Sequence, residues 1–201
     1  MRQRCRFSVV RMLCIATAGV WLIGGASLLP AQPPDRYIKG YQGPYRGRVL
    51  DAETKAPLAG AVVVVVWERV KVQLIQSATV FYAAREVLTD ANGEFILHAE
   101  DIERKAPRQT LRPRFVVFTP GYASARGVFD PRTKIELMEL RRLETLEERR
   151  RALLSPFDIG AVGMDESNRK VIWLLPRKKL EHFLRLINVE RFALGLGPIE
   201  Y

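Results

Sequence analysis

The side chains that most often carry catalysis or bind metals are scarce in this chain. Both cysteines, Cys5 and Cys14, lie near the N-terminus, and the only histidines are His98 and His182. The part of the chain beyond the N-terminal segment therefore excludes disulfides, cysteine nucleophiles and thiolate metal sites, and the usual multi-histidine metal site is excluded as well. Any catalysis would depend on carboxylates, Lys, Arg, Tyr, Ser or Thr.

One short stretch has oxygen-bearing side chains at the spacing of a calcium loop. Asp90, Asn92 and Glu94 are alternate residues of a predicted turn, and calcium loops place their ligands in this way. Calcium takes about six to eight oxygen ligands, however, and this turn offers only three side chains. We therefore expect an ordinary turn, and no metal or other cofactor.

Three aromatic residues could bind a sugar. Trp67, Phe81 and Tyr82 lie in β-rich stretches, and a pyranose ring stacks on flat aromatic side chains that are exposed. The alternative, which we favour, is that these residues belong to the core or to the faces of a sheet.

The chain is basic, with a formal net charge of +10. Four arginines lie in residues 1–31, so 28 basic and 22 acidic residues, a net +6, remain from Gln32 onward. This balance is compatible with anionic partners but requires none. Further arginines at 141–142 and 149–151 alternate with glutamates, which indicates a solvated helix face, and export makes nucleic acid an improbable partner.

Residues 1–31 have the pattern of an export signal. The arginines precede an uncharged run of 18 residues, 12–29, which ends near Pro30 and Ala31. We expect a signal peptide, cleaved after Ala31 or Ala26. The alternative is an uncleaved anchor, because spanning a bilayer takes about 20 residues. Either way the rest of the chain would be exported, to the periplasm, the cell envelope or the medium. Residues 32–44 are rich in Pro and Gly and predict a linker.

Residues 45–140 are typical of a mainly β domain. Strands are predicted at 46–50, 61–67, 68–76, 78–88, 95–97, 114–119 and 134–140, with a hairpin at Asn92-Gly93 and a solvated link at 100–112. About seven strands suggest a β-sandwich of immunoglobulin-like size. In the valine run 62–66 both faces are apolar, so a central strand covered on both sides is expected, or a strand with one face covered by something outside the sandwich.

Residues 141–201 have helical periodicity. A capping box at Thr145 and Glu148 predicts a helix with Leu146, Leu153 and Leu154 on one face, followed by a loop at 156–170. A second helix is predicted from Pro176 to about Gly195. The apolar face of this helix consists of Leu180, Phe183, Leu184 and Ile187. We expect this face either to pack on the sandwich or to enter a partner's groove.

Three motifs in residues 45–140 resemble the carboxypeptidase regulatory-like family of prealbumin-type domains. They are the G-x-V-x-D…P-L-x-G-A start at 47–61, the T-D-x-x-G-x-F turn at 89–95, and Gly121-Tyr122. The resemblance implies a seven-stranded prealbumin-like or transthyretin-like sandwich that acts as an accessory domain. In metallocarboxypeptidases such a domain accompanies a zinc domain, but His98-Ala-Glu100 lacks the H-x-x-E spacing of that site.

The first motif also resembles that of transthyretin-related hydrolases. Their chemistry requires a histidine two positions before the leucine of this motif, and here that position is Arg48. It also requires a Tyr-Arg-Gly-Ser carboxyl terminus, whereas residues 197–201 read GPIEY. We therefore expect a protein that is not an enzyme.

The sequence as a whole predicts a non-catalytic, exported accessory or interaction protein of the bacterial cell envelope. Its partner would be another envelope protein or a cell-wall or surface polysaccharide, and membrane contact would be limited to residues 12–29 if they are not cleaved. The alternative is a carbohydrate-binding module of the same sandwich class. The predicted ligand or partner surface comprises Trp67, Phe81, Tyr82, Leu180, Phe183, Leu184 and Ile187.

Overall fold

The computed structural model describes residues 37–40, 42–72, 77–130, 133, 135–153, 162–165, 170–173 and 179–199. The chain divides into two units, Met1–Gln32 and Pro33–Tyr201, and all described residues lie in the second. The predicted signal or anchor segment lies outside the described residues. Within them, no helix is long and apolar enough to cross a membrane.

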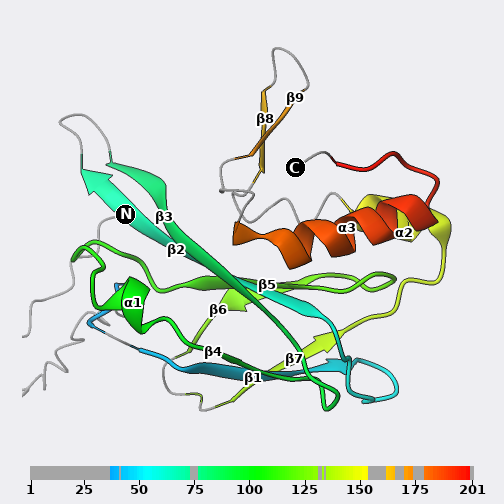
Figure 1. Ribbon diagram of the computed structural model, residues 1–201, viewed down its shortest axis with the longest axis horizontal. Helices are drawn as coiled ribbons and strands as arrows, with labels where there is room; N and C mark the ends of the chain where they lie inside the picture. Colours follow the sequence, from blue (N-terminus) through cyan, green and yellow to red (C-terminus); the bar gives the residue numbers. More distant parts are fainter. Residues whose placement is uncertain are drawn as a thin grey trace, which may run out of the picture. The chain divides into compact units, whose positions relative to one another are not determined.

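The described part of the chain is mainly β (Figure 1). Its first sheet has three strands in the order β4 (Glu94–Leu97), β1 (Tyr45–Asp51) and β7 (Glu136–Leu140). Strand β1 pairs with β4 in antiparallel and with β7 in parallel orientation. The chain therefore places its first and seventh strands side by side.

The second sheet has four antiparallel strands. Their order is β3 (Ser77–Leu88), β2 (Val62–Val72), β5 (Arg114–Phe118) and β6 (Ala125–Val128). A separate antiparallel pair consists of β8 (Val162–Asp165) and β9 (Lys170–Trp173).

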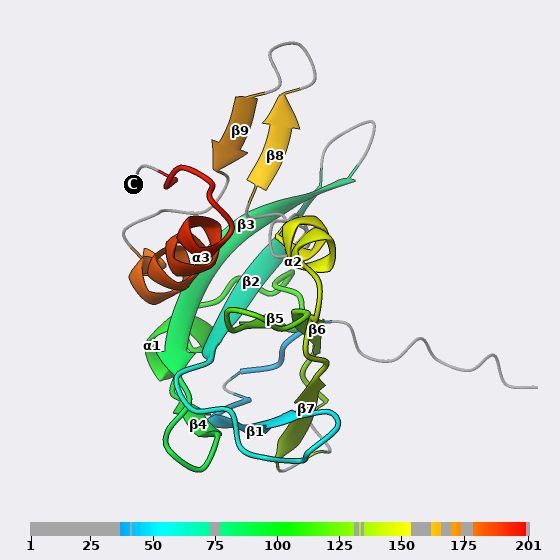
Figure 2. The same cartoon turned by 90° about the vertical axis from the view of Figure 1, so that its right-hand side faces the viewer.

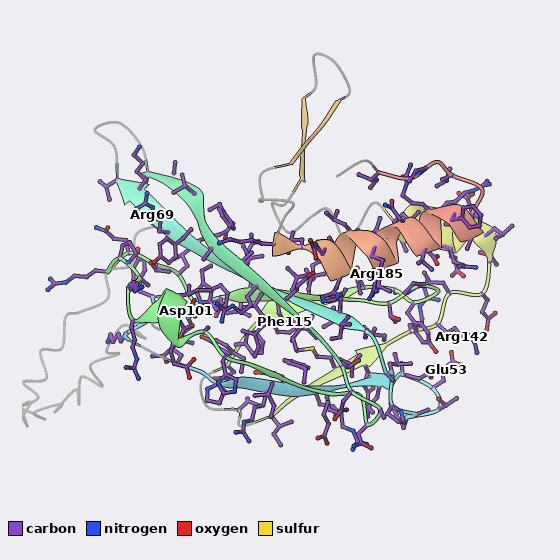
Figure 3. All side chains as sticks on the ribbon, in the orientation of Figure 1. Glu53, Arg69, Asp101, Phe115, Arg142 and Arg185 are labelled. Atoms are coloured by element: carbon purple, nitrogen blue, oxygen red, sulfur yellow. The ribbon has the colours of Figure 1, made fainter. Side chains whose placement is uncertain are left out.

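The valine strand β2 separates two hydrophobic clusters. Side chains alternate along a strand, so Val63 and Val65 contact one cluster while Val62, Val64 and Val66 contact the other. The first cluster contains buried residues of both sheets, and Phe115 lies within it (Figure 3). The expectation of a strand covered on both sides is confirmed, because all five valines are at most 1% exposed.

Helix α3 (Glu181–Ala193) covers the second face of the four-stranded sheet (Figure 2). The predicted apolar residues Leu180, Phe183, Leu184 and Ile187 are buried in the second cluster. The Phe183 ring meets Phe118 of β5 edge to face, with centroids 6.0 Å apart. Burying an aliphatic or aromatic side chain of this size contributes roughly 1.5–3 kcal/mol, so this stripe holds the helix on the sheet.

The start of α3 is capped from the sheet. Its N-cap residue, Leu180, has no capping side chain. Instead, the Glu86 carboxylate on β3 accepts hydrogen bonds from the backbone N–H groups of His182 (2.8 Å) and Phe183 (3.0 Å). A negative charge at a helix N-terminus is favourable, so β3 both packs against the helix and caps it.

Helix α2 (Leu146–Ala152) begins with the predicted capping box, since Thr145 and Glu148 make both reciprocal hydrogen bonds. The predicted apolar face of α2 is wrong in part: Leu153 is buried, whereas Leu146 is 58% exposed. Leu154 lies outside the described residues. The box determines where the helix starts, but a helix this short can anchor through a single leucine.

Several predicted connections are wrong. The turn at Asn92-Gly93 does not close a hairpin, because β3 pairs with β2 and β4 pairs with β1, so this turn joins the two sheets. Residues 100–112 include helix α1 (Glu100–Glu103), in which Glu103 is buried. The predicted loop 156–170 contains β8, and an unpredicted strand, β6, precedes β7.

Candidate interaction surface

The three aromatic residues considered as a possible sugar platform do not form one. Trp67 is 0% exposed, and its indole Nε1 donates a hydrogen bond to Glu103 (2.8 Å). Phe81 packs against the cluster beneath α3, whereas Tyr82 packs against the cluster shared by the two sheets. Successive residues of a strand point to opposite faces, so the three rings form no common platform and lie in the core or on the sheet faces, which is the alternative that the sequence favoured.

The predicted partner surface on α3 is also taken up within the chain. Leu180, Phe183, Leu184 and Ile187 are each at most 1% exposed. Of the two locations considered for this apolar face, the structure supports packing on the chain's own sheet. A partner that approaches α3 meets other residues, among which Phe192 is the most exposed large hydrophobic residue, at 85%.

Glu103 is a buried carboxylate that the sequence did not single out. It accepts hydrogen bonds from the Gln42 backbone N–H (2.7 Å), the Trp67 indole N–H and the Tyr45 hydroxyl. These donors come from the segment before β1, from β1 and from β2. A buried carboxylate must be hydrogen-bonded to be tolerated, so Glu103 holds these three segments together.

A cavity of about 340 Å³ lies beside Glu103. Its described lining is Tyr37, Ile38, Lys39, Gly40, Glu103, Ala106, Pro107 and Arg108. Both oxygens of the Glu103 carboxylate already accept hydrogen bonds from the protein, so we assign this residue a structural role.

Asp51 links two of the sequence motifs. It accepts hydrogen bonds from the backbone N–H groups of Thr54 and Glu53 (2.9 Å each) and from the Tyr122 hydroxyl (3.0 Å). These bonds, led by the one from Thr54, lower the pKa of Asp51 to about 2. Burial, followed by the neighbouring Asp51, raises the pKa of Tyr122. The pair joins the turn after β1 to the turn after β5.

The candidate calcium residues form an ordinary turn. Asp90 Oδ1 accepts hydrogen bonds from the backbone N–H groups of Asn92 (2.9 Å) and Glu94 (2.8 Å). An aspartate that bonds its own backbone in this way stabilises a turn. The part of the chain that the structure describes holds no group of three or more His, Cys, Asp or Glu that could bind a metal.

The solvent side of the three-stranded sheet carries exposed apolar residues. Eight large hydrophobic residues are exposed among those described, and three of them, Ile96 (49%), Ile135 (61%) and Leu137 (60%), lie on or beside this sheet. In the paired register Ile96 faces Arg46 and Leu137 faces Arg48. The intervening residues Phe95, Met138 and Leu140 point into the cluster between the two sheets. Ile96, Ile135 and Leu137 therefore lie on the opposite side of the three-stranded sheet.

We call this surface the outer face. It consists of Arg46, Arg48, Glu94, Ile96, Ile135 and Leu137. Arg48 donates from Nε to the Asn92 carbonyl (3.0 Å), and Glu139 at the rim pairs with Lys55 (2.7 Å). The outer face therefore combines a basic central strand with apolar neighbours on both flanking strands.

Comparison with known proteins does not assign the chain to a family. No family model matches the chain, and no curated protein matches it. Among solved structures, a 9R-lipoxygenase from Cyanothece PCC8801 aligns with 55% of this chain at 14% identity and a TM-score of 0.27. The alignment covers 19% of the lipoxygenase chain. A similarity at this level carries no argument about fold or activity.

Proposed function

We propose that this protein is a non-catalytic interaction protein, exported to the bacterial cell envelope, that presents the outer face to a partner. The observation that carries the proposal is the contrast between its two sheets. Helix α3 buries the free side of the four-stranded sheet, whereas the free side of the three-stranded sheet exposes Ile96, Ile135 and Leu137. Exposed apolar residues that gather on one face of a sheet can mark an interaction surface.

We further propose that residues 45–140 form a prealbumin-like sandwich of the carboxypeptidase regulatory-like family. Two motif residues have contacts that support this assignment. Gly47 leaves room for the Phe95 ring, and Gly93, with φ of +73°, brings the backbone close to the Val49 carbonyl. The hydrogen bond between Tyr122 and Asp51 joins two further motif positions.

The non-catalytic part of the proposal is supported by the buried carboxylates. Asp51, Glu103 and Glu190 each accept hydrogen bonds from neighbouring protein groups, which suits a structural role. The burial of Trp67 removes the observation that motivated a carbohydrate-binding module. The proposal that the protein is exported is based on the sequence pattern of residues 1–31.

In-cell photocrosslinking tests the proposed function. A photoreactive phenylalanine analogue at Leu137 should yield a defined crosslinked adduct, because this side chain is 60% exposed on the outer face. The same analogue at Phe192, which is 85% exposed on α3, is the control. The proposal fails if position 137 gives no adduct, or only the adducts that position 192 also gives.

A further inference from the structure

The outer face carries charges of both signs. From Gln32 onward the chain carries a net +6, so two copies carry net charge of the same sign. On the outer face, however, Arg46 and Arg48 lie beside Glu94, and the nearby Glu139 is paired with Lys55. Both signs of charge thus occur together with apolar side chains.

Two opposite charges on this face, Arg46 and Glu94, form no ion pair in the part of the chain that the structure describes. Within the described residues, neither the Arg46 guanidinium nor the Glu94 carboxylate takes part in a hydrogen bond or ion pair. Across the β1–β4 pair Arg46 faces Ile96, and Glu94 faces Arg48, whose guanidinium Nε bonds the Asn92 carbonyl. The two charges are therefore available to a molecule that approaches the face.

We propose that the partner on the outer face is a second copy of this chain, and that the two copies pack face to face through their three-stranded sheets. This inference rests on the proposed function and names its partner. In a two-fold symmetric contact every interaction occurs twice, so Arg46 of each copy can meet Glu94 of the other. Ile96, Ile135 and Leu137 supply apolar area at the same contact.

Charge complementarity favours a second copy over other occupants. An anionic polymer or membrane would gain from arginines but would be repelled by Glu94, and a cationic partner would meet Arg46 and Arg48. A copy of the same face offers both signs. Because the face is small, we expect a weak dimer with a dissociation constant on the order of micromolar.

The first test uses matched substitutions in the full chain, with the dimer dissociation constant measured by native mass spectrometry and sedimentation. Leu137→Glu should raise this constant about tenfold or more. Phe192→Glu introduces the same charge at an exposed apolar residue on another surface and should leave it unchanged. Equal effects of the two substitutions, or a native chain that stays monomeric at several hundred micromolar, overturn the inference.

The second test exchanges charges. Arg46→Glu and Glu94→Arg should each weaken self-association, because each turns the proposed contact between position 46 of one copy and position 94 of the other into a contact between like charges. An equimolar mixture of the two variants should form a heterodimer, in which the two introduced charges meet each other and the native Glu94 of one copy meets the native Arg46 of the other. A mixture that pairs no better than either variant alone overturns the inference. Unfolding midpoints of all variants show that each is folded.

The outcomes separate the inference from the proposed function. A chain that is monomeric but crosslinks from position 137 to a different protein overturns the dimer and leaves the proposed function standing. A chain that neither dimerises nor crosslinks from position 137 overturns both.

Discussion

Gly47 is a residue of the three-stranded sheet at which there is no room for an added methyl group. A Cβ at this position would lie 2.6 Å from the Phe95 ring and 2.7 Å from the Glu136 carbonyl oxygen. Since Phe95 is buried between β1 and the shared cluster, it cannot move without disturbing the core. We expect Gly47→Ala to lower the free energy of unfolding by about 2 kcal/mol, as measured by urea denaturation.

Gly197→Ala is the control for this substitution. The residue is exposed, and beyond its chain neighbours no atom lies within 4 Å of the point that an added Cβ would occupy. Its unfolding free energy should match that of the native protein. Equal stability of the Gly47 and Gly197 variants would contradict the packing of Phe95 over β1.

Asp51 should make stability depend on pH in the acid range. Its pKa is about 2 in the folded protein against an ordinary value of 3.8, so folding favours the charged form. The stability that it contributes is complete above about pH 4 and is lost as the pH falls towards 2. The difference in urea midpoint between the native protein and Asp51→Asn should therefore shrink between about pH 4 and pH 2. A difference that stays constant over this range would contradict the lowered pKa.

Among the elements, the two C-terminal helices are joined by one buried ion pair. Arg149 of α2 donates to Glu190 of α3 through Nε (2.8 Å) and a terminal nitrogen (2.6 Å), and Gly121 N–H donates to the same carboxylate (3.1 Å). The Glu190 side chain is 3% exposed. Arg149→Met would leave a buried carboxylate without its cation, so we expect a loss of about 3 kcal/mol.

Arg151→Met provides the comparison, since Arg151 pairs with Glu147 on the surface at 3.5 Å and the two side chains are 74% and 73% exposed. Exposed pairs of this kind contribute less than about 0.5 kcal/mol. Chemical denaturation of both variants distinguishes the two pairs. Similar losses would mean that the Arg149 pair does not hold α2 to α3.

Sequence patterns predicted those elements whose signal is local. The valine run, the capping box at Thr145 and the apolar stripe from Leu180 to Ile187 each correspond to an observed element. Their periodicity indicates which faces are buried, but whether this helix or a partner covers the second valine face was settled only by the structure.

Which strands pair, and which single polar residues are buried, could not be predicted from such local patterns. The Asn92-Gly93 turn reports a local backbone conformation, and nothing in it specifies that β4 pairs with β1 rather than β3. Glu103 lies in a polar segment without periodicity, and its donors Tyr45 and Trp67 are 58 and 36 residues away in sequence. The outer face was missed because Ile96 and Leu137 are exposed members of strands whose buried residues dominate the pattern.

At the scale of the whole molecule, α3 covers the second apolar face of strand β2. Phe183→Asp should place a charge in the cluster beneath α3 and reduce stability by at least about 3 kcal/mol. Because the valines of β2 would then face solvent, binding of a hydrophobic dye should rise in parallel. Phe192→Asp, on the same helix but 85% exposed, should change neither quantity. Dye binding that is the same for both variants would contradict the covering role of α3.

The parallel pairing of β1 with β7 also determines how this part of the chain responds to tension. Residues 47–51 pair with residues 136–140 and run in the same direction. A pull applied between Tyr45 and Leu140 therefore acts along both strands in opposite senses. The hydrogen bonds between them are loaded together in shear and cannot open one at a time, so this sheet is arranged to resist force transmitted along the backbone from one end of the paired strands to the other.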